Sequence, residues 1–154
     1  MKLTSLRLVV ASLLLAASTS FAADLSPKAP DKLTPARTLI EQKKWTAAVD
    51  ELKKINDPAS ADWNNLMGYS LRKADAGNAA EAEKFYSEAL RIDPKHRGAL
   101  EYSGELYLMT GNLPMAEERL AVLNKACFLP CEEYSDLKRA VARYKANGNK
   151  YVAE

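Results

Sequence analysis

The stretch that decides the fold is residues 63–123, which read WNNLMGYSLRKADAGNAAEAEKFYSEALRIDPKHRGALEYSGELYLMTGNLPMAEERLAVL. One pattern occurs twice in it: a helix with Gly-x-x-Leu or Gly-x-x-Tyr, a Gly-Asn turn, and a second helix that begins around an alanine. Ala82 and Ala116 are 34 residues apart, and so are Tyr86 and Leu120. A fixed period of this length predicts a repeat of helix pairs.

A third, weaker copy precedes these two. Counting 34 residues back from the second helices gives Ala48, Leu52 and Ile55. The glycines of the first helices are 36 residues apart instead, because Asp75 and Ala76 lengthen the turn of the middle copy. Small residues let two helix axes approach closely, and the larger residues that follow fill the groove between them. The sequence therefore predicts three stacked helix pairs.

This pattern resembles the tetratricopeptide repeat, a helix-turn-helix unit of 34 residues. The third unit matches at Gly104, Tyr107, Gly111, Ala116, Leu120 and Leu123, and the second at Gly68, Leu71, Gly77, Ala82, Tyr86, Ala89 and Pro94. The first unit matches at Ala36, Leu39, Ala48, Leu52 and Ile55, with Lys43 in place of the turn glycine. The resemblance covers about residues 31–126 and implies an all-α solenoid. Three units are expected over 34–126.

Local signals divide these units into helices. Helices are expected over 34–42, 45–55, 59–74, from Asn78 to Asp93, from Pro94 to the Gly111 turn, and over 113–126. Thr34 is the expected N-cap of the first helix, and Asn78 with Glu81 matches a capping box. Trp45 is expected in the core with the apolar face of its helix.

Residues 1–22 have the form of a signal peptide. A basic start, an apolar stretch from Leu8 to Ala17 and a small-residue site ending at Ala22 match its three regions. Cleavage after Ala22 is expected, with residues 23–33 as an extended leader; an uncleaved membrane anchor is the alternative. The mature protein is expected to be periplasmic or secreted, without stable membrane insertion.

Charge gives no sign of a nucleic-acid partner. The chain has 22 Lys and Arg against 20 Asp and Glu, and two of the basic residues, Lys2 and Arg7, lie in the signal. The processed chain would therefore have no net charge, whereas a nucleic-acid-binding domain typically carries a basic patch. We expect no nucleic-acid partner.

Residues 132–147 are expected to form a helix that caps the last repeat. Leu137, Ala140, Val141 and Tyr144 make a narrow apolar stripe among charged residues. A terminal cap needs one face for the neighbouring repeat and one for water. Residues 148–154 form a tail.

No arrangement of residues typical of an active site is found. The single histidine, His96, lies between the second and third units without a partner in sequence, and we interpret it as an exposed residue at a helix start. We expect a non-enzymatic protein without a cofactor.

Cys127 and Cys131 bracket the residues 127–131, a turn before the cap helix. Pro130 interrupts any helix there, so the two thiols can turn toward one another. In an exported protein a disulfide is the expected state. A redox pair and a copper(I) site are the alternatives, although the thioredoxin spacing and a third ligand are missing. The tail from Cys127 to Tyr134 also resembles that of small exported bacterial proteins of the repeat family.

The resemblance implies a binding site on the concave face, lined by the first helix of each unit. The candidate partner-binding residues are Asn65, Tyr69, Arg72, Lys73, Glu101, Glu105, Leu108 and Met109, with Asp62, Arg37, Ile40 and Glu41 nearby. A water-covered face of mixed charge is the alternative. The Lys and Asn that clamp a peptide carboxylate in some family members are replaced by Leu33 and Arg37. The function expected is a protein-interaction module of the cell envelope that binds a partner peptide or helix; the alternative is a thiol-based metal or redox accessory protein.

Overall fold

The computed structural model describes residues 31–129 and 131–152, which contain α-helices and no strand. The α-helices are α1 (Thr34–Glu41), α2 (Trp45–Ile55), α3 (Ala61–Ala74), α4 (Ala79–Ile92), α5 (Arg97–Met109), α6 (Leu113–Ala126) and α7 (Glu132–Ala146), and a short 3-10 helix, η1 (Ala76–Asn78), precedes α4. The expected all-α class is confirmed. The signal peptide and the leader up to residue 30 lie outside the described residues.

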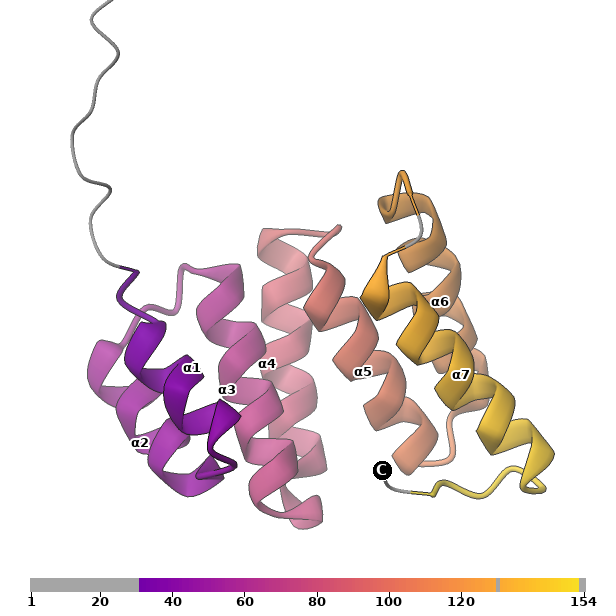
Figure 1. The fold of residues 1–154 in the computed structure, drawn as a ribbon, viewed down its shortest axis with the longest axis horizontal. Helices are drawn as coiled ribbons and strands as arrows, with labels where there is room; N and C mark the ends of the chain where they lie inside the picture. The colour runs from indigo at the N-terminus through magenta and orange to yellow at the C-terminus, as the bar shows by residue number, and fades with distance from the viewer. Residues whose placement is uncertain (1–30, 130, 153–154) are drawn as a thin grey trace, which may run out of the picture.

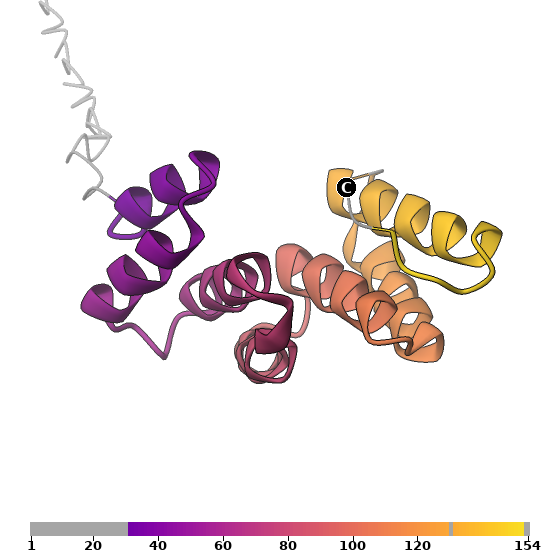
Figure 2. The ribbon, with the colours of Figure 1, turned by 90° about the horizontal axis from the view of Figure 1, so that it is seen from below.

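The helices form a row of antiparallel pairs, α1 with α2, α3 with α4 and α5 with α6, and α7 packs beside α5 and α6 (Figure 1). Seen from below, the row follows an arch with α1 and α7 at its two ends (Figure 2). After α7 the chain turns back, and residues 148–152 run toward the lower end of α5 (Figure 1).

Small residues sit where the helices of a pair meet. Ala48, Ala82 and Ala116, which occupy the same position in the three units, are fully buried. A methyl group added to Gly68 would lie 2.9 Å from a ring carbon of Tyr86 and 3.0 Å from the Ala82 carbonyl oxygen. Because a carbonyl of the backbone cannot move away cheaply, glycine is required there. The repeat register read from the sequence is confirmed.

The cap helix α7 belongs to the core rather than covering it loosely. A methyl group at Gly104 would lie 2.6 Å from a Leu137 methyl carbon, so the missing side chain on α5 makes room for α7. Leu137 is fully buried. At the equivalent place in the second unit the space beside Gly68 is filled by Tyr86 of the same unit, which the third unit replaces with the smaller Leu120.

Helix bodies agree with the sequence better than helix starts. The expected helices over 45–55 and 113–126 are confirmed. The N-cap of α1 is Leu33 and not Thr34, which is the first helical residue. The fifth helix begins at Arg97 and not at Pro94, because Asp93 caps α4 and a turn separates the two helices.

Two further expectations about this region were wrong. Asn78 forms no capping box, because its amide donates a hydrogen bond to the Leu71 carbonyl at 3.2 Å, across the longer turn that η1 occupies. Trp45 is not in the core: it is half-buried, and its ring lies edge-on to Tyr69 at 5.8 Å. Trp45 is the first residue of α2, and its ring also lies against Lys73 near the end of α3.

Candidate functional site

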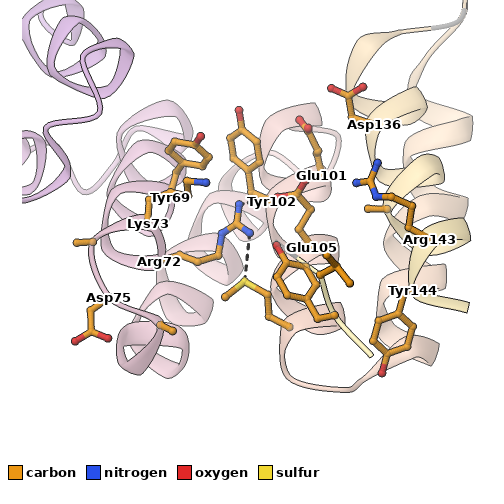
Figure 3. Close-up of a pocket in the computed structure, with 16 residues that line it drawn as sticks. Tyr69, Arg72, Lys73, Asp75, Glu101, Tyr102, Glu105, Asp136, Arg143 and Tyr144 are labelled. Carbon is orange, nitrogen blue, oxygen red and sulfur yellow. Dashed lines mark hydrogen bonds and ion pairs between the residues drawn. The ribbon is translucent and has the colours of Figure 1, made fainter. Parts of the chain in front are cut away.

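A cavity of about 510 Å³ opens between α3, α5 and α7, with the C-terminal tail at one side (Figure 3). Its lining comprises Tyr69, Arg72, Lys73, Ala74, Asp75, Ala76, Glu101, Tyr102, Glu105, Met109, Asp136, Ala140, Arg143, Tyr144, Tyr151 and Val152. Tyr69 and Arg72 lie about one turn apart on α3, as Glu101 and Glu105 do on α5. Helical spacing therefore aims these side chains into one space.

An ion pair joins α3 and α5 at the floor of the cavity. Arg72 donates to a Glu105 carboxylate oxygen at 2.7 Å and lies 3.5 Å from the Met109 sulfur (Figure 3). The Arg72 side chain is only 3% exposed. Burial disfavours its charge, but Tyr86 and Glu105 outweigh that effect and keep the pKa of Arg72 above its ordinary value. The guanidinium is thus a fixed part of the wall.

Aromatic rings surround this ion pair. The centroids of Tyr69 and Tyr102 are 4.4 Å apart, and the Arg72 guanidinium lies 5.6 Å and 5.8 Å from them. Burial is the main cause that raises the pKa of Tyr69, Tyr86 and Tyr102, so the three phenols stay protonated at neutral pH. At the rim, Lys73 lies 5.7 Å from the Trp45 ring.

Glu101 is the carboxyl group with the most unusual environment in the cavity. The residue is 7% exposed. Burial raises its pKa to about 8, and the negative charges of Glu105, Asp136 and Glu133 act in the same direction, while Arg72 opposes them weakly. Glu101 is therefore mostly neutral at pH 7, which is uncommon for a carboxyl group.

A second set of polar contacts links the starts of the first helices. Asp62 forms an ion pair with Arg37 at 3.3 Å and accepts a hydrogen bond from the Nε2–H of the His96 ring at 2.9 Å. The other ring nitrogen of His96 accepts a hydrogen bond from the Ala99 amide at 3.0 Å. His96 is a helix-start residue, as expected, but it is half-buried and joins two repeats instead of pointing into water.

Six of the eight predicted partner-binding residues line the cavity: Tyr69, Arg72, Lys73, Glu101, Glu105 and Met109. The other two do not. Leu108 is 1% exposed and belongs to the core, because it faces away from the concave side. Asn65 is 6% exposed and packs against Gly98, where a methyl group would lie 2.9 Å from its amide nitrogen. Whether the other six bind a partner stays a prediction.

The sequence reading missed the wall that α7 and the tail provide. Tyr102, Asp136, Arg143, Tyr144 and Tyr151 all line the cavity. A signal for α7 existed: it follows the third unit where the first helix of another unit would lie, so its inner face should also line the groove. Nothing in the sequence pattern indicated that residues 148–152 turn back.

The two cysteines are joined in a disulfide, with their Cα atoms 5.9 Å apart. The loop they close presents Phe128, which is 100% exposed, and Leu129, which is 71% exposed. Within residues 31–129 and 131–152, no group of three or more His, Cys, Asp and Glu side chains is placed to hold a metal ion. Across the same ranges, every helix is too short or too polar to span a bilayer.

The comparison with protein families decides the class. The family model described as tetratricopeptide repeat matches residues 73–141, which include the second half of the middle pair, the third pair and part of α7. The chain contains tetratricopeptide repeats. No curated protein matches this tetratricopeptide repeat sequence.

Solved structures share the fold. The type III secretion translocator chaperone SycD of Yersinia enterocolitica superposes with a TM-score of 0.65 at 17% identity, over 76% of this chain and 83% of that one. A second structure of SycD, in complex with a peptide of the translocator YopD, gives a TM-score of 0.60 at 18% identity, over 75% and 88%. At such identities the likeness concerns the fold alone.

Proposed function

We propose that this tetratricopeptide repeat protein is a non-catalytic interaction module of the cell envelope, exported to the periplasm, which binds a segment of a partner protein along its concave face. The observation that carries the proposal is the cavity between α3, α5 and α7, where Tyr, Arg and Met side chains gather. These residue types are enriched at protein interfaces.

The structurally similar chaperone gives independent support for a peptide ligand. SycD was solved with a translocator peptide, so a helical array of this shape and size can hold a segment of another protein. The cavity here holds both charges and aromatic rings, which suits a segment of mixed polarity in extended or helical form.

A cross-linking experiment tests the binding face. A photoreactive phenylalanine replaces Lys73, an exposed residue of the cavity rim, and in a matched variant it replaces Lys84, an exposed residue of α4. After irradiation of intact cells, mass spectrometry maps the attached segment. We expect one recurrent partner segment from position 73 and none from position 84. Equal cross-linking from both positions, or from position 84 alone, would place binding off the concave face.

Export is tested on the same material. The signal-like residues 1–22 support the proposal that the mature protein begins at Ala23 and occurs in the periplasmic fraction. N-terminal sequencing after cell fractionation measures both. Intact Met1 on protein of the cytoplasmic fraction would contradict export and remove the reason to expect a disulfide in the cell.

The oxidation state of the two cysteines tests the competing thiol-based function. A thiol titration without reductant, together with metal analysis of the purified protein, is the measurement. We expect no free thiol and no stoichiometric copper. Reduced cysteines with bound copper would reclassify the chain as a metal-handling protein on a repeat scaffold.

A further inference from the structure

Glu101 is a buried carboxyl group that no residue of the described chain pairs with. It lines the cavity and is more than nine-tenths buried, yet within residues 31–129 and 131–152 it makes neither a hydrogen bond nor an ion pair. Its carboxyl oxygens are not among the fully enclosed polar atoms, so they open onto the cavity. A carboxyl group kept in this state at a cavity wall points to a partner that arrives from outside.

The cation that acts on Glu101, Arg72, already has a partner. Arg72 is bound to Glu105, and Lys73 lies against the Trp45 ring. The charged groups facing Glu101 are Glu105 on its own helix, Arg72 from α3, and Glu133 and Asp136 from α7, while Arg143 of α7 also lines the cavity. Three of the four groups that act on Glu101 are acidic, so the local potential favours an incoming positive charge.

The walls suit the rest of a basic side chain. Tyr69 and Tyr102 from α3 and α5, and Tyr144 and Tyr151 from α7 and the tail, place four rings around the cavity. Ring faces attract cations, and the methylene stem of lysine or arginine packs well against aromatic surface. An acid at the wall of an aromatic cavity thus matches both ends of such a side chain.

We infer that the cavity receives a lysine or arginine side chain of the bound segment, and that its cationic group pairs with the Glu101 carboxylate. This inference rests on the proposed function, because it names the chemistry that the groove selects. It makes the ligand a segment with a basic residue at the position that faces α5, and it excludes one that is acidic there.

Binding should then depend on pH. With a pKa of about 8, free Glu101 must lose its proton before it pairs with a cation, and pairing lowers that pKa. Affinity should therefore rise as pH increases toward 8 and level off above it, by about tenfold per pH unit if only the ionised form binds.

The test uses N-acetyl-L-arginine amide as the probe, because it carries the guanidinium without any partner sequence. Its control is N-acetyl-L-citrulline amide, which has nearly the same shape and no charge. The isotope-labelled protein, with its disulfide intact, is titrated with each by nuclear magnetic resonance at pH 6, 7, 8 and 9. The variants are Glu101→Gln and, as a matched control, Glu81→Gln at an exposed position of α4.

We expect saturable chemical-shift changes around Tyr69, Glu101 and Tyr102 with the arginine probe and none with the citrulline probe. Binding of the arginine probe should be tighter at higher pH. It should be at least tenfold weaker in Glu101→Gln and unchanged in Glu81→Gln. No saturable shifts with the arginine probe would overturn the inference. Equal binding of both probes, or full binding in Glu101→Gln, would also overturn it. Either result would show that binding needs neither the charge of the probe nor the ionised Glu101 carboxylate. If one of these results were found while position 73 still cross-links to a partner segment, the proposed function would stand. Only the inference of a basic side chain in the cavity would be rejected.

Discussion

At the scale of single residues, two adjacent cations of α3 have opposite roles. The Arg72 side chain is 3% exposed and paired with Glu105, whereas Lys73 is exposed at the rim. The sequence places both on the concave face and does not distinguish the buried cation from the exposed one. The burial of Arg72 depends on Glu105, 33 residues further along the chain, so it follows from the packing of α3 on α5 and not from any local pattern.

The first prediction compares Arg72→Ala with Lys73→Ala. Removing one member of a buried ion pair leaves the other charge without a partner, so we expect Arg72→Ala to reduce the free energy of unfolding by about 3 kcal/mol. Lys73→Ala removes only an exposed contact with the Trp45 ring and should cost about 1 kcal/mol or less. Urea unfolding followed by circular dichroism measures both. Equal effects would contradict the burial of Arg72.

A second prediction at this scale concerns Glu101 and the stability of the free protein. The unfolded chain releases this proton near pH 4.5, while the folded chain holds it until about pH 8. The folded state therefore binds more protons between these values, and the free energy of unfolding contributed by Glu101 falls as pH rises from about 4.5 to about 8.

Glu101→Gln should remove this pH dependence. We expect its melting temperature to match that of the parent near pH 5 and to exceed it by several degrees above pH 8, because glutamine stays neutral. Thermal melts over this range measure the difference, with Glu81→Gln as the control. A difference that does not change with pH would mean that the Glu101 carboxyl is ionised in the folded protein at neutral pH.

At the scale of helices, the sequence determined most of what the structure shows. The bounds of α2 and α6 were predicted to the residue, and chain breakers such as Pro58 after α2 and Gly111 before α6 act locally. Cap contacts were less predictable: Asn78 turns to the Leu71 carbonyl only because the preceding turn is two residues longer. The apolar stripe predicted for α7 is confirmed, since its four residues are the buried ones, but a stripe does not tell how deeply the helix will pack.

The third prediction tests how deeply α7 packs. Leu137→Ala should leave a cavity beside Gly104 and cost about 2–5 kcal/mol, as for other buried leucines. Leu129→Ala, the same substitution at a residue that is 71% exposed, is the matched control and should be nearly neutral. Chemical denaturation of the two variants gives the comparison. A neutral Leu137→Ala would show that α7 lies loosely on the third unit.

The fourth prediction concerns the disulfide. A closed loop this short restricts the unfolded chain by about 2 kcal/mol in the chain-entropy model, and its effect should be concentrated on α7, which follows the second cysteine directly. Replacing Cys127 and Cys131 with serine should increase amide hydrogen exchange in α7 and leave α3 and α4 protected. Mass spectrometry of exchanged peptides resolves these segments. A uniform increase over all helices would mean that the bridge stabilises the whole array.

At the scale of the whole molecule, the repeats are joined unequally. The second and third units are linked at both ends of their first helices, by Asp62 with His96 at one end and by Arg72 with Glu105 at the other. The first unit is joined to the second at one end, by the ion pair of Arg37 with Asp62 and by a buried hydrogen bond from the Trp63 indole to the Leu52 carbonyl at 2.8 Å. At its other end, Trp45 contacts Tyr69 and Lys73 through rings and a single exposed charge.

The fifth prediction follows from this difference. Native-state hydrogen exchange should show α1 opening at a lower free energy than α3 and α5, because stability in repeat arrays is set by each unit and its neighbours. Asp62→Ala should lower the opening free energy of α1 further, by about 1 kcal/mol or less for partly exposed pairs. Protection that is equal in α1 and α5 would contradict this order.

The contacts at both ends of α3 and α5, a hydrogen bond from His96 to Asp62 and the ion pair of Arg72 with Glu105, also bear on where the arch can bend. Two helices linked at both ends should keep their spacing, and α7, which packs against Gly104, should hold the C-terminal side in the same way. We therefore expect the larger movement where the first and second units meet beside Trp45, at the end opposite the Trp63–Leu52 hydrogen bond. A segment lying in the groove would then contact α3, α5 and α7, whose spacing changes little. The pair of α1 and α2 would shift to accept segments of different thickness.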